Sequence, residues 1–217
     1  MTEYNETPRK AKSAASRRFI LGAGLSLAPI ALLGGAGTAK ADGPHYLSNG
    51  QKKIFRSIQA HENAHVEYLV AALGAKARPK PTFKDLRQKN LKDFARVAQA
   101  LENTGVGAYL GAAPFITNKD ILKAAGSILT IEARHAGAVN ALLIAPVSVG
   151  DASFERPLGP LQVVAAAGGF VASLNGGWAL SYSDQLSELN DLKILNFALA
   201  LEYLEAEFYN VNTRFYA

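Results

Sequence analysis

The sequence has no cysteine among its 217 residues. This absence excludes disulfide bonds, iron–sulfur clusters, rubredoxin-like centres and catalysis by a thiol. Any metal ion that the chain binds must therefore be held by oxygen and nitrogen ligands. The chain is otherwise rich in apolar residues, 49% in total, which is enough for one domain with a full core.

A strong excess of charge is also missing from the part of the chain that we expect to fold. The formal net charge is +5, but residues 1–41 contain six Lys or Arg and two Glu, so only about +1 remains on residues 42–217. A domain with so little positive charge lacks the electrostatic footprint of a nucleic-acid-binding protein. We expect no nucleic-acid partner.

The sequence has no long uninterrupted hydrophobic run. Residues 16–21 read SRRFIL and open a weakly apolar stretch, Gly22 to Gly37, which glycines and Pro29 interrupt before a small-residue cleavage site at residues 39–41. This pattern predicts a twin-arginine export signal over residues 1–41 and a mature domain over residues 42–217, located in the periplasm or outside the cell. The alternative is a membrane anchor, but so short and glycine-rich a run is a poor spanning helix, so we expect no stable membrane insertion after cleavage.

Apolar periodicity predicts four long helices, over about residues 48–74, 90–111, 117–142 and from 191 to near the end of the chain. Ser48 is the expected N-cap of the first helix and Gly74 its end. Residues 75–89, with two prolines, form a linker that can extend roughly 45 Å, more than the ~37 Å length of a 25-residue helix. We expect this linker to cross the full length of a helix bundle.

Two regions are harder to interpret. Gly105, Gly107 and Gly111 lie in the last turns of the second predicted helix, where each costs about 1 kcal/mol relative to alanine, so close helix packing or a local distortion is needed to explain them. Residues 145–190 contain three prolines and read as a loop, with a short buried helix expected in the apolar stretch Leu161 to Leu174.

Two copies of Glu-x-x-His lie about seventy residues apart, Glu62 with His65 and Glu132 with His135. Residues three apart share one face of a helix, so each copy directs a carboxylate and an imidazole the same way. Both copies fall on apolar stripes, where an isolated charge is too costly to bury, and two such faces can enclose a dinuclear metal site.

The other two long helices contain a second repeat. Glu102 is followed seven residues later by Tyr109, and Glu202 seven residues later by Tyr209. Two helices with one Glu each and two with Glu-x-x-His make up the inventory of di-metal carboxylate bundles.

Residues 101–109, 131–136 and 195–209 resemble the ferritin-like family that includes desiccation-related proteins and many exported bacterial proteins, and the resemblance covers nearly all of residues 47–215. It implies an all-α fold, a ferritin-like four-helix bundle. It also implies that two Fe or two Mn ions are the cofactor. The ligands implied by the resemblance are Glu62, His65, Glu102, Glu132, His135 and Glu202, with Tyr109 and Tyr209 beside them as hydrogen-bonding groups.

The helix order departs from that family. Ferritin-like proteins have the order Glu, Glu-x-x-His, Glu, Glu-x-x-His, whereas here the helix that resembles the first one comes last. Three explanations remain open: a circular permutation, a helix that completes a neighbouring subunit, and a rearranged gene. We favour permutation, which predicts that the start near Tyr46 and the end near Phe215 lie close together.

Several residues have alternative readings. Glu205 lies one helical turn from Glu202 and competes with it as the ligand on that helix. The two tyrosines are equally well explained as core residues with satisfied hydroxyl groups. His61 and Arg134 are expected at the surface.

Ligand type indicates the chemistry, because four carboxylates and two imidazoles suit Fe(II) or Mn(II), which exchange electrons with dioxygen or peroxide. The first hypothesis is accordingly an exported oxidoreductase that oxidises ferrous iron, removes peroxide or disproportionates it, in oxidative or desiccation stress. The second is a structural or stress-protective bundle that binds metal without turnover, and whether the chain is an enzyme stays open. A third hypothesis is an interaction module that uses residues 161–178 as an apolar patch. The sequence also leaves open a homodimer.

Overall fold

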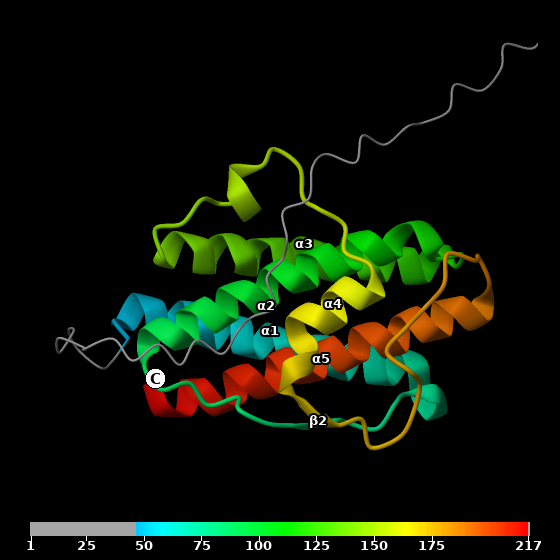
Figure 1. The fold of residues 1–217 in the computed structure, drawn as a ribbon, viewed down its shortest axis with the longest axis horizontal. Coiled ribbons are helices and arrows are strands. Elements are labelled where there is room, and N and C mark those ends of the chain that lie inside the picture. The colour runs from blue at the N-terminus through cyan, green and yellow to red at the C-terminus, as the bar shows by residue number, and fades with distance from the viewer. Residues whose placement is uncertain (1–46, 217) are drawn as a thin grey trace, which may run out of the picture.

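A computed structural model describes residues 47–216, so the predicted export signal lies outside the described residues. Four long helices, α1 (Asn49–Leu73), α2 (Leu91–Ala112), α3 (Lys119–Leu142) and α5 (Glu188–Tyr216), form a bundle (Figure 1). The predicted all-α fold is confirmed. Among the described residues no helix is long and apolar enough to cross a membrane.

Side chains fix where three of these helices begin. Ser48 accepts a hydrogen bond from the backbone of Gln51 and starts α1, as expected, while Asn90 and Asn118 cap α2 and α3 in the same way. Helix α1 ends at Gly74, which takes a positive φ of 52°. The predicted boundaries hold because these caps are visible in the sequence.

The linker between α1 and α2 runs along α5, as its predicted reach allowed. The backbone N–H of Arg78 donates to Asn196, and the backbone N–H of Gln88 donates to Asn212, sixteen residues further along α5. The linker also contains the short strand β1 (Thr82–Phe83). Helices α1 and α2 therefore start at the same end of the bundle.

The four long helices pack as two antiparallel pairs. Gln59 of α1 donates to Asn210 of α5, and His65 reaches back to Glu202, so these helices run in opposite directions. Gln99 of α2 likewise donates to Asn140 near the end of α3. The start of α1 and the end of α5 consequently lie at the same end of the molecule (Figure 1). Helix α5 completes the bundle of its own chain, as a circular permutation predicts.

Residues 143–187 form an outer layer rather than one loop. Helix α4 (Pro160–Ala167) packs on α2, and the strand β2 (Val171–Ser173) pairs antiparallel with β1. Short 3-10 turns lie at Gly74–Lys76, Ala113–Phe115, Val149–Asp151 and Gly168–Phe170. The prediction of a single helix from Leu161 to Leu174 was wrong beyond Ala167, because Phe170 turns into the core and the next residues pair with the linker.

Residues 161–178, the predicted apolar patch, include both buried and exposed apolar side chains. Val163 and Ala167 of α4 are buried in the core together with Phe170, whereas the side chain of Leu161 is 86% exposed. Part of this segment thus stabilises the bundle and part of it stays at the surface.

Two of the three unexplained glycines let this outer layer approach α2. A Cβ atom on Gly111 would lie 2.0 Å from the backbone oxygen of Leu158, and the N–H of Leu158 donates to the backbone oxygen of Gly107 at 2.8 Å. A segment that passes this closely over a helix requires glycine. Close packing therefore explains Gly107 and Gly111.

The buried interior of the bundle contains two apolar clusters with a polar layer between them. One cluster includes Phe55 and Phe94, and the other includes Leu69 and Ile128. On every long helix the predicted ligand residues fall between the positions that belong to these clusters. The apolar clusters thus hold the polar layer away from water.

Candidate metal centre

All four long helices contribute to the polar layer. Helix α1 brings Glu62 and His65, and α3 brings Glu132 and His135, in each case from positions one turn apart. Helices α2 and α5 add one glutamate each. The four carboxylates, those of Glu62, Glu102, Glu132 and Glu202, are 0% exposed. The six residues predicted from the sequence therefore meet in the interior of one chain.

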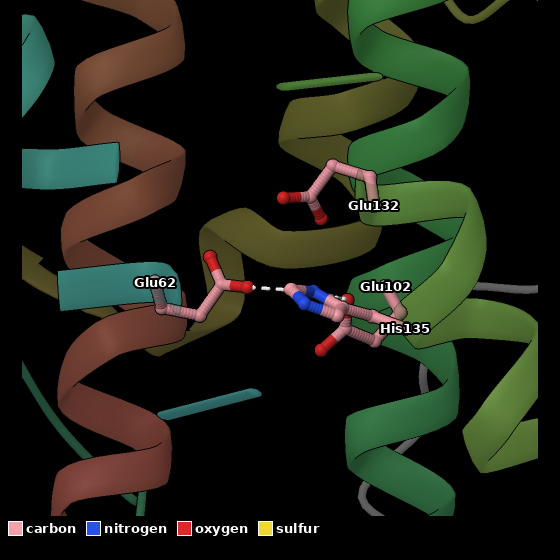
Figure 2. Close-up of side chains that lie close together, drawn as sticks. All are labelled: Glu62, Glu102, Glu132 and His135. Carbon is pink, nitrogen blue, oxygen red and sulfur yellow. Dashed lines mark ion pairs between the residues drawn. The ribbon is translucent and has the colours of Figure 1, made fainter. Parts of the chain in front are cut away.

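Their oxygen and nitrogen atoms converge in two groups of four. One group contains Glu62, Glu102, Glu132 and His135, and the other contains Glu62, His65, Glu132 and Glu202; within each group the possible ligand atoms lie within 4.8 Å of one another. Figure 2 shows the first group, in which Glu62 reaches across the bundle towards the side chains from α2 and α3. Glu62 and Glu132 belong to both groups and therefore connect them.

The Nδ1 atom of each histidine faces carboxylates from two other helices. Nδ1 of His65 lies 3.1 Å from Glu202 Oε2 and 3.2 Å from Glu132 Oε1. Nδ1 of His135 lies 2.8 Å from Glu62 Oε1 and 3.2 Å from Glu102 Oε2. In the metal-free chain, protonated imidazoles in these pairs balance the negative charge of the carboxylates, as a bound cation would otherwise do.

The pKa values reflect this crowding. Burial raises the pKa of Glu62 to about 7, although His135 and His65 act against it. Burial, followed by the charges of Glu62 and Glu202, also raises the pKa of Glu132 well above its usual range. Burial alone would lower the pKa of His65, but contacts with Glu132, Glu202 and Glu62 raise it to about 12. Burial likewise acts to lower the pKa of His135, but contacts with Glu102 and Glu62 raise it to about 9.

The carboxylates lack the partners that a permanently metal-free core would need. Neither oxygen of Glu62 and neither oxygen of Glu132 accepts a hydrogen bond of good geometry, and Oε2 of Glu102 accepts none either. Leaving buried carboxylates unsatisfied is expensive, and a cation is the simplest compensation. Carboxylate oxygen and imidazole nitrogen are donors that Fe(II) and Mn(II) accept. The residues present therefore fit a metal-binding site.

Two tyrosines form hydrogen bonds with Glu102 and Glu202, the carboxylates that each belong to only one of the two groups. The hydroxyl of Tyr109 on α2 donates to Glu202 Oε1 on α5 at 2.5 Å, and the hydroxyl of Tyr209 on α5 donates to Glu102 Oε1 on α2. The two helices exchange these bonds because each tyrosine lies two turns beyond its own glutamate. Both tyrosines are thus buried core residues with satisfied hydroxyl groups, and their hydroxyls lie against carboxylates of the predicted site.

Glu205, the predicted competitor of Glu202, is also fully buried beside the site. Glu202 belongs to a converging group and Glu205 belongs to neither. The alternative ligand on α5 is therefore not needed to complete the two groups, yet the sequence did not predict that both carboxylates would be buried.

His61 is exposed, as expected, but it also contacts the site. Its Nδ1 lies 2.9 Å from Nε2 of His135, and the two rings stack with centroids 5.2 Å apart. Sequence reasoning missed this contact because residue 61 lies next to the buried stripe of α1 rather than on it. A hydrogen bond at Nε2 fixes which nitrogen of His135 faces the carboxylates. Arg134 is exposed, as predicted.

A four-helix bundle with two Glu-x-x-His helices and two single-glutamate helices around one buried layer is the architecture of the di-metal carboxylate proteins. A family model described as a ferritin-like domain matches residues 30–145 and 190–215, well over half of the chain. The chain belongs to this family. The match leaves out residues 146–189, most of the outer layer, and its first residues fall within the predicted signal. No curated protein and no solved structure shows a significant match.

Proposed function

We propose that this protein is exported, binds two Fe or Mn ions in the polar layer and uses them to react with dioxygen or peroxide. The observation that carries the proposal is the pair of four-residue groups that share Glu62 and Glu132. Two ions bridged by the same carboxylates lie close enough to act on one small molecule. A bound pair would supply two electrons to dioxygen or peroxide, and in a ferroxidase the ferrous ions would themselves be the substrate that is oxidised.

The side chains of the chain have distinct roles in this proposal. Glu62 and Glu132, which belong to both groups, would hold both ions, whereas Glu102 with His135, and Glu202 with His65, would each hold one. The tyrosines orient the carboxylates of Glu102 and Glu202. In Glu202, for example, Oε1 accepts a hydrogen bond from Tyr109 and Oε2 faces Nδ1 of His65. Each terminal carboxylate therefore keeps one oxygen free to face the ions.

Burial favours a small reactant over an organic substrate. The four carboxylates are inaccessible, and the most open part of the site is the side chain of His65, which is 11% exposed. A hollow of about 770 Å³ lies between α2, α4 and residues 145–156, but none of the eight predicted site residues lines it. Dioxygen, peroxide and single metal ions are small enough to enter such a site during brief openings of the bundle.

The cellular setting follows from the export signal expected in residues 1–41. A protein that crosses the membrane by the twin-arginine route crosses folded, so it can be loaded with metal in the cytoplasm. Protection against oxidative or desiccation stress, outside the cytoplasmic membrane, is consistent with that route and with the desiccation-related proteins that the sequence resembles.

The second candidate function is a stress-protective bundle that holds metal without turnover. The complete burial of the carboxylates favours it, because a site closed on all sides stabilises the fold when metal is bound and admits reactants poorly. Tight metal binding without reaction with peroxide or dioxygen distinguishes this candidate from the first.

The test is a metal count on purified protein that has been loaded anaerobically with Fe(II) or Mn(II). We expect about two ions per chain in the wild type, loss of both ions in Glu62→Ala/Glu132→Ala, and loss of one ion in Glu102→Gln, because Glu102 belongs to one group only. Oxidation on addition of peroxide or dioxygen, followed by absorption spectroscopy, then separates the redox function from metal storage.

Glu207→Gln is the matched control, since this residue lies on α5 but pairs with Lys80 at the surface. It should bind as many ions as the wild type. A folded wild-type chain that binds no stoichiometric metal would rule out both candidate functions.

A further inference from the structure

A fifth carboxylate lies beside the metal centre without a role in it. Glu205 on α5 follows Glu202 by one turn and is 0% exposed. Neither of its oxygens has a hydrogen-bond partner. Burying a carboxylate without any partner is costly, so its position calls for an explanation.

The space that Glu205 faces is opened by the remaining unexplained glycine. A Cβ atom on Gly105 of α2 would lie 2.9 Å from Glu132 Oε2 and 3.3 Å from Glu205 Oε1. Both carboxylates therefore approach one point on the surface of α2, and any larger residue there would displace them. Gly105 thus brings Glu205 to the edge of the site beside the shared carboxylate of Glu132.

Charge counting indicates when a fifth carboxylate is useful. The four carboxylates of the two groups, when ionised, balance two divalent ions. When each ion loses one electron, the pair gains two positive charges inside a buried layer where water cannot screen them. A further anion within reach then becomes favourable, and Glu205 is the buried carboxylate in that position.

Resting on the metal pair proposed above, we infer that Glu205 is an auxiliary carboxylate of the centre, one whose charge stabilises the oxidised pair. With peroxide as the oxidant, a bound pair of divalent ions would supply the two electrons that, with two protons, break the O–O bond and convert peroxide to two water molecules. Glu205 takes no part in the bond changes. It compensates the charge that remains on the ions, from the Glu132 side of the site.

The experiment compares the full chain with Glu205→Gln, which removes the charge and keeps the size. Glu207→Gln is the control on the same helix. Each protein is loaded anaerobically with Fe(II) or Mn(II), its ions are counted, and its midpoint potential is measured by mediated titration. We expect about two ions in all three proteins and a potential shifted to more positive values in Glu205→Gln but not in Glu207→Gln. Glu205→Asp, which retains the charge, should show a smaller shift than Glu205→Gln.

The outcomes separate this inference from the proposed function. If the wild type binds no metal, the metal pair itself is wrong and the inference falls with it. If the wild type binds two ions and Glu205→Gln has the same potential, only the role of Glu205 is wrong. Glu205→Met, which fills the same volume with apolar atoms, replaces Glu205→Gln if the amide prevents folding, and it should shift the potential in the same direction.

Discussion

Each tyrosine beside the site holds a carboxylate of the opposite helix by one oxygen. Tyr209 binds Oε1 of Glu102, and Oε2 of the same residue lies 3.2 Å from Nδ1 of His135. The sequence could predict that Tyr209 lies near a carboxylate, because Glu-x6-Tyr spans two turns of a helix. It could not predict which carboxylate, since the exchange depends on the antiparallel packing of α2 and α5.

At the same scale, the metal-free protein should lose stability as pH rises from 5 to 9. The pKa of Glu62 is raised from 4.5 to about 7, so folding keeps a proton there and stability falls between these pH values. The pKa of His135 is raised from 6.5 to about 9, so its protonated form stabilises the folded state. This contribution is fully present below pH 6.5 and is lost as pH rises through 9. One pKa unit is about 1.4 kcal/mol, so we expect the Tm to fall by about 5 °C or more.

Thermal unfolding followed by circular dichroism, in the presence of a chelator, measures this trend. Excess Mn(II) should reverse it, because the ligands must lose protons to bind metal. Glu62→Gln should flatten the part of the metal-free curve between pH 4.5 and 7. A metal-free Tm that climbs steadily from pH 5 to 9 would contradict the pKa values of the buried cluster.

At the scale of elements, the four long helices could be predicted because their caps and apolar stripes are local. Helix α5 begins at Glu188, three residues before the start expected near Asp191. The strands β1 and β2 could not be predicted, since they are two and three residues long and depend on a pairing between distant segments. The sequence identified Gly107 and Gly111 as anomalous, but their cause, Leu158, lies over forty residues away.

Gly111→Ala should therefore destabilise the protein by about 1–3 kcal/mol, because its new Cβ would collide with the backbone of Leu158. Gly126→Ala in the middle of α3 is the matched control, since a Cβ there meets nothing within 4 Å. That control should gain up to about 1 kcal/mol from better helix propensity. Urea unfolding measures the change in stability of both variants. Equal effects of the two substitutions would mean that the outer layer does not pack closely against α2 at Gly111.

At the scale of the whole molecule, the order of the helices and their arrangement in space are independent of each other. Helix α5 comes last of the long helices, yet it pairs with α1, the first of them. The sequence revealed the unusual order, and the packing of α5 against α1 in the same chain is consistent with a permuted domain.

A chain permuted back to the usual order should fold and bind metal as the natural one does. The new ends would fall between Asp184 and Gln185, which are exposed, and a flexible linker would join the end of α5 to Leu47. We expect the same helical content by circular dichroism and the same number of ions per chain. A folded permuted chain that binds no metal would mean that the natural connections, and not the packing alone, position the ligands.

The place of α5 at the end of the order has a consequence for biosynthesis. Glu202, which completes one group of ligands, and Tyr209, which orients the other, are both on this helix. The group that contains Glu202 can therefore form only once α5 has been made and has packed against α1, whereas the group of Glu62, Glu102, Glu132 and His135 needs only the three earlier helices.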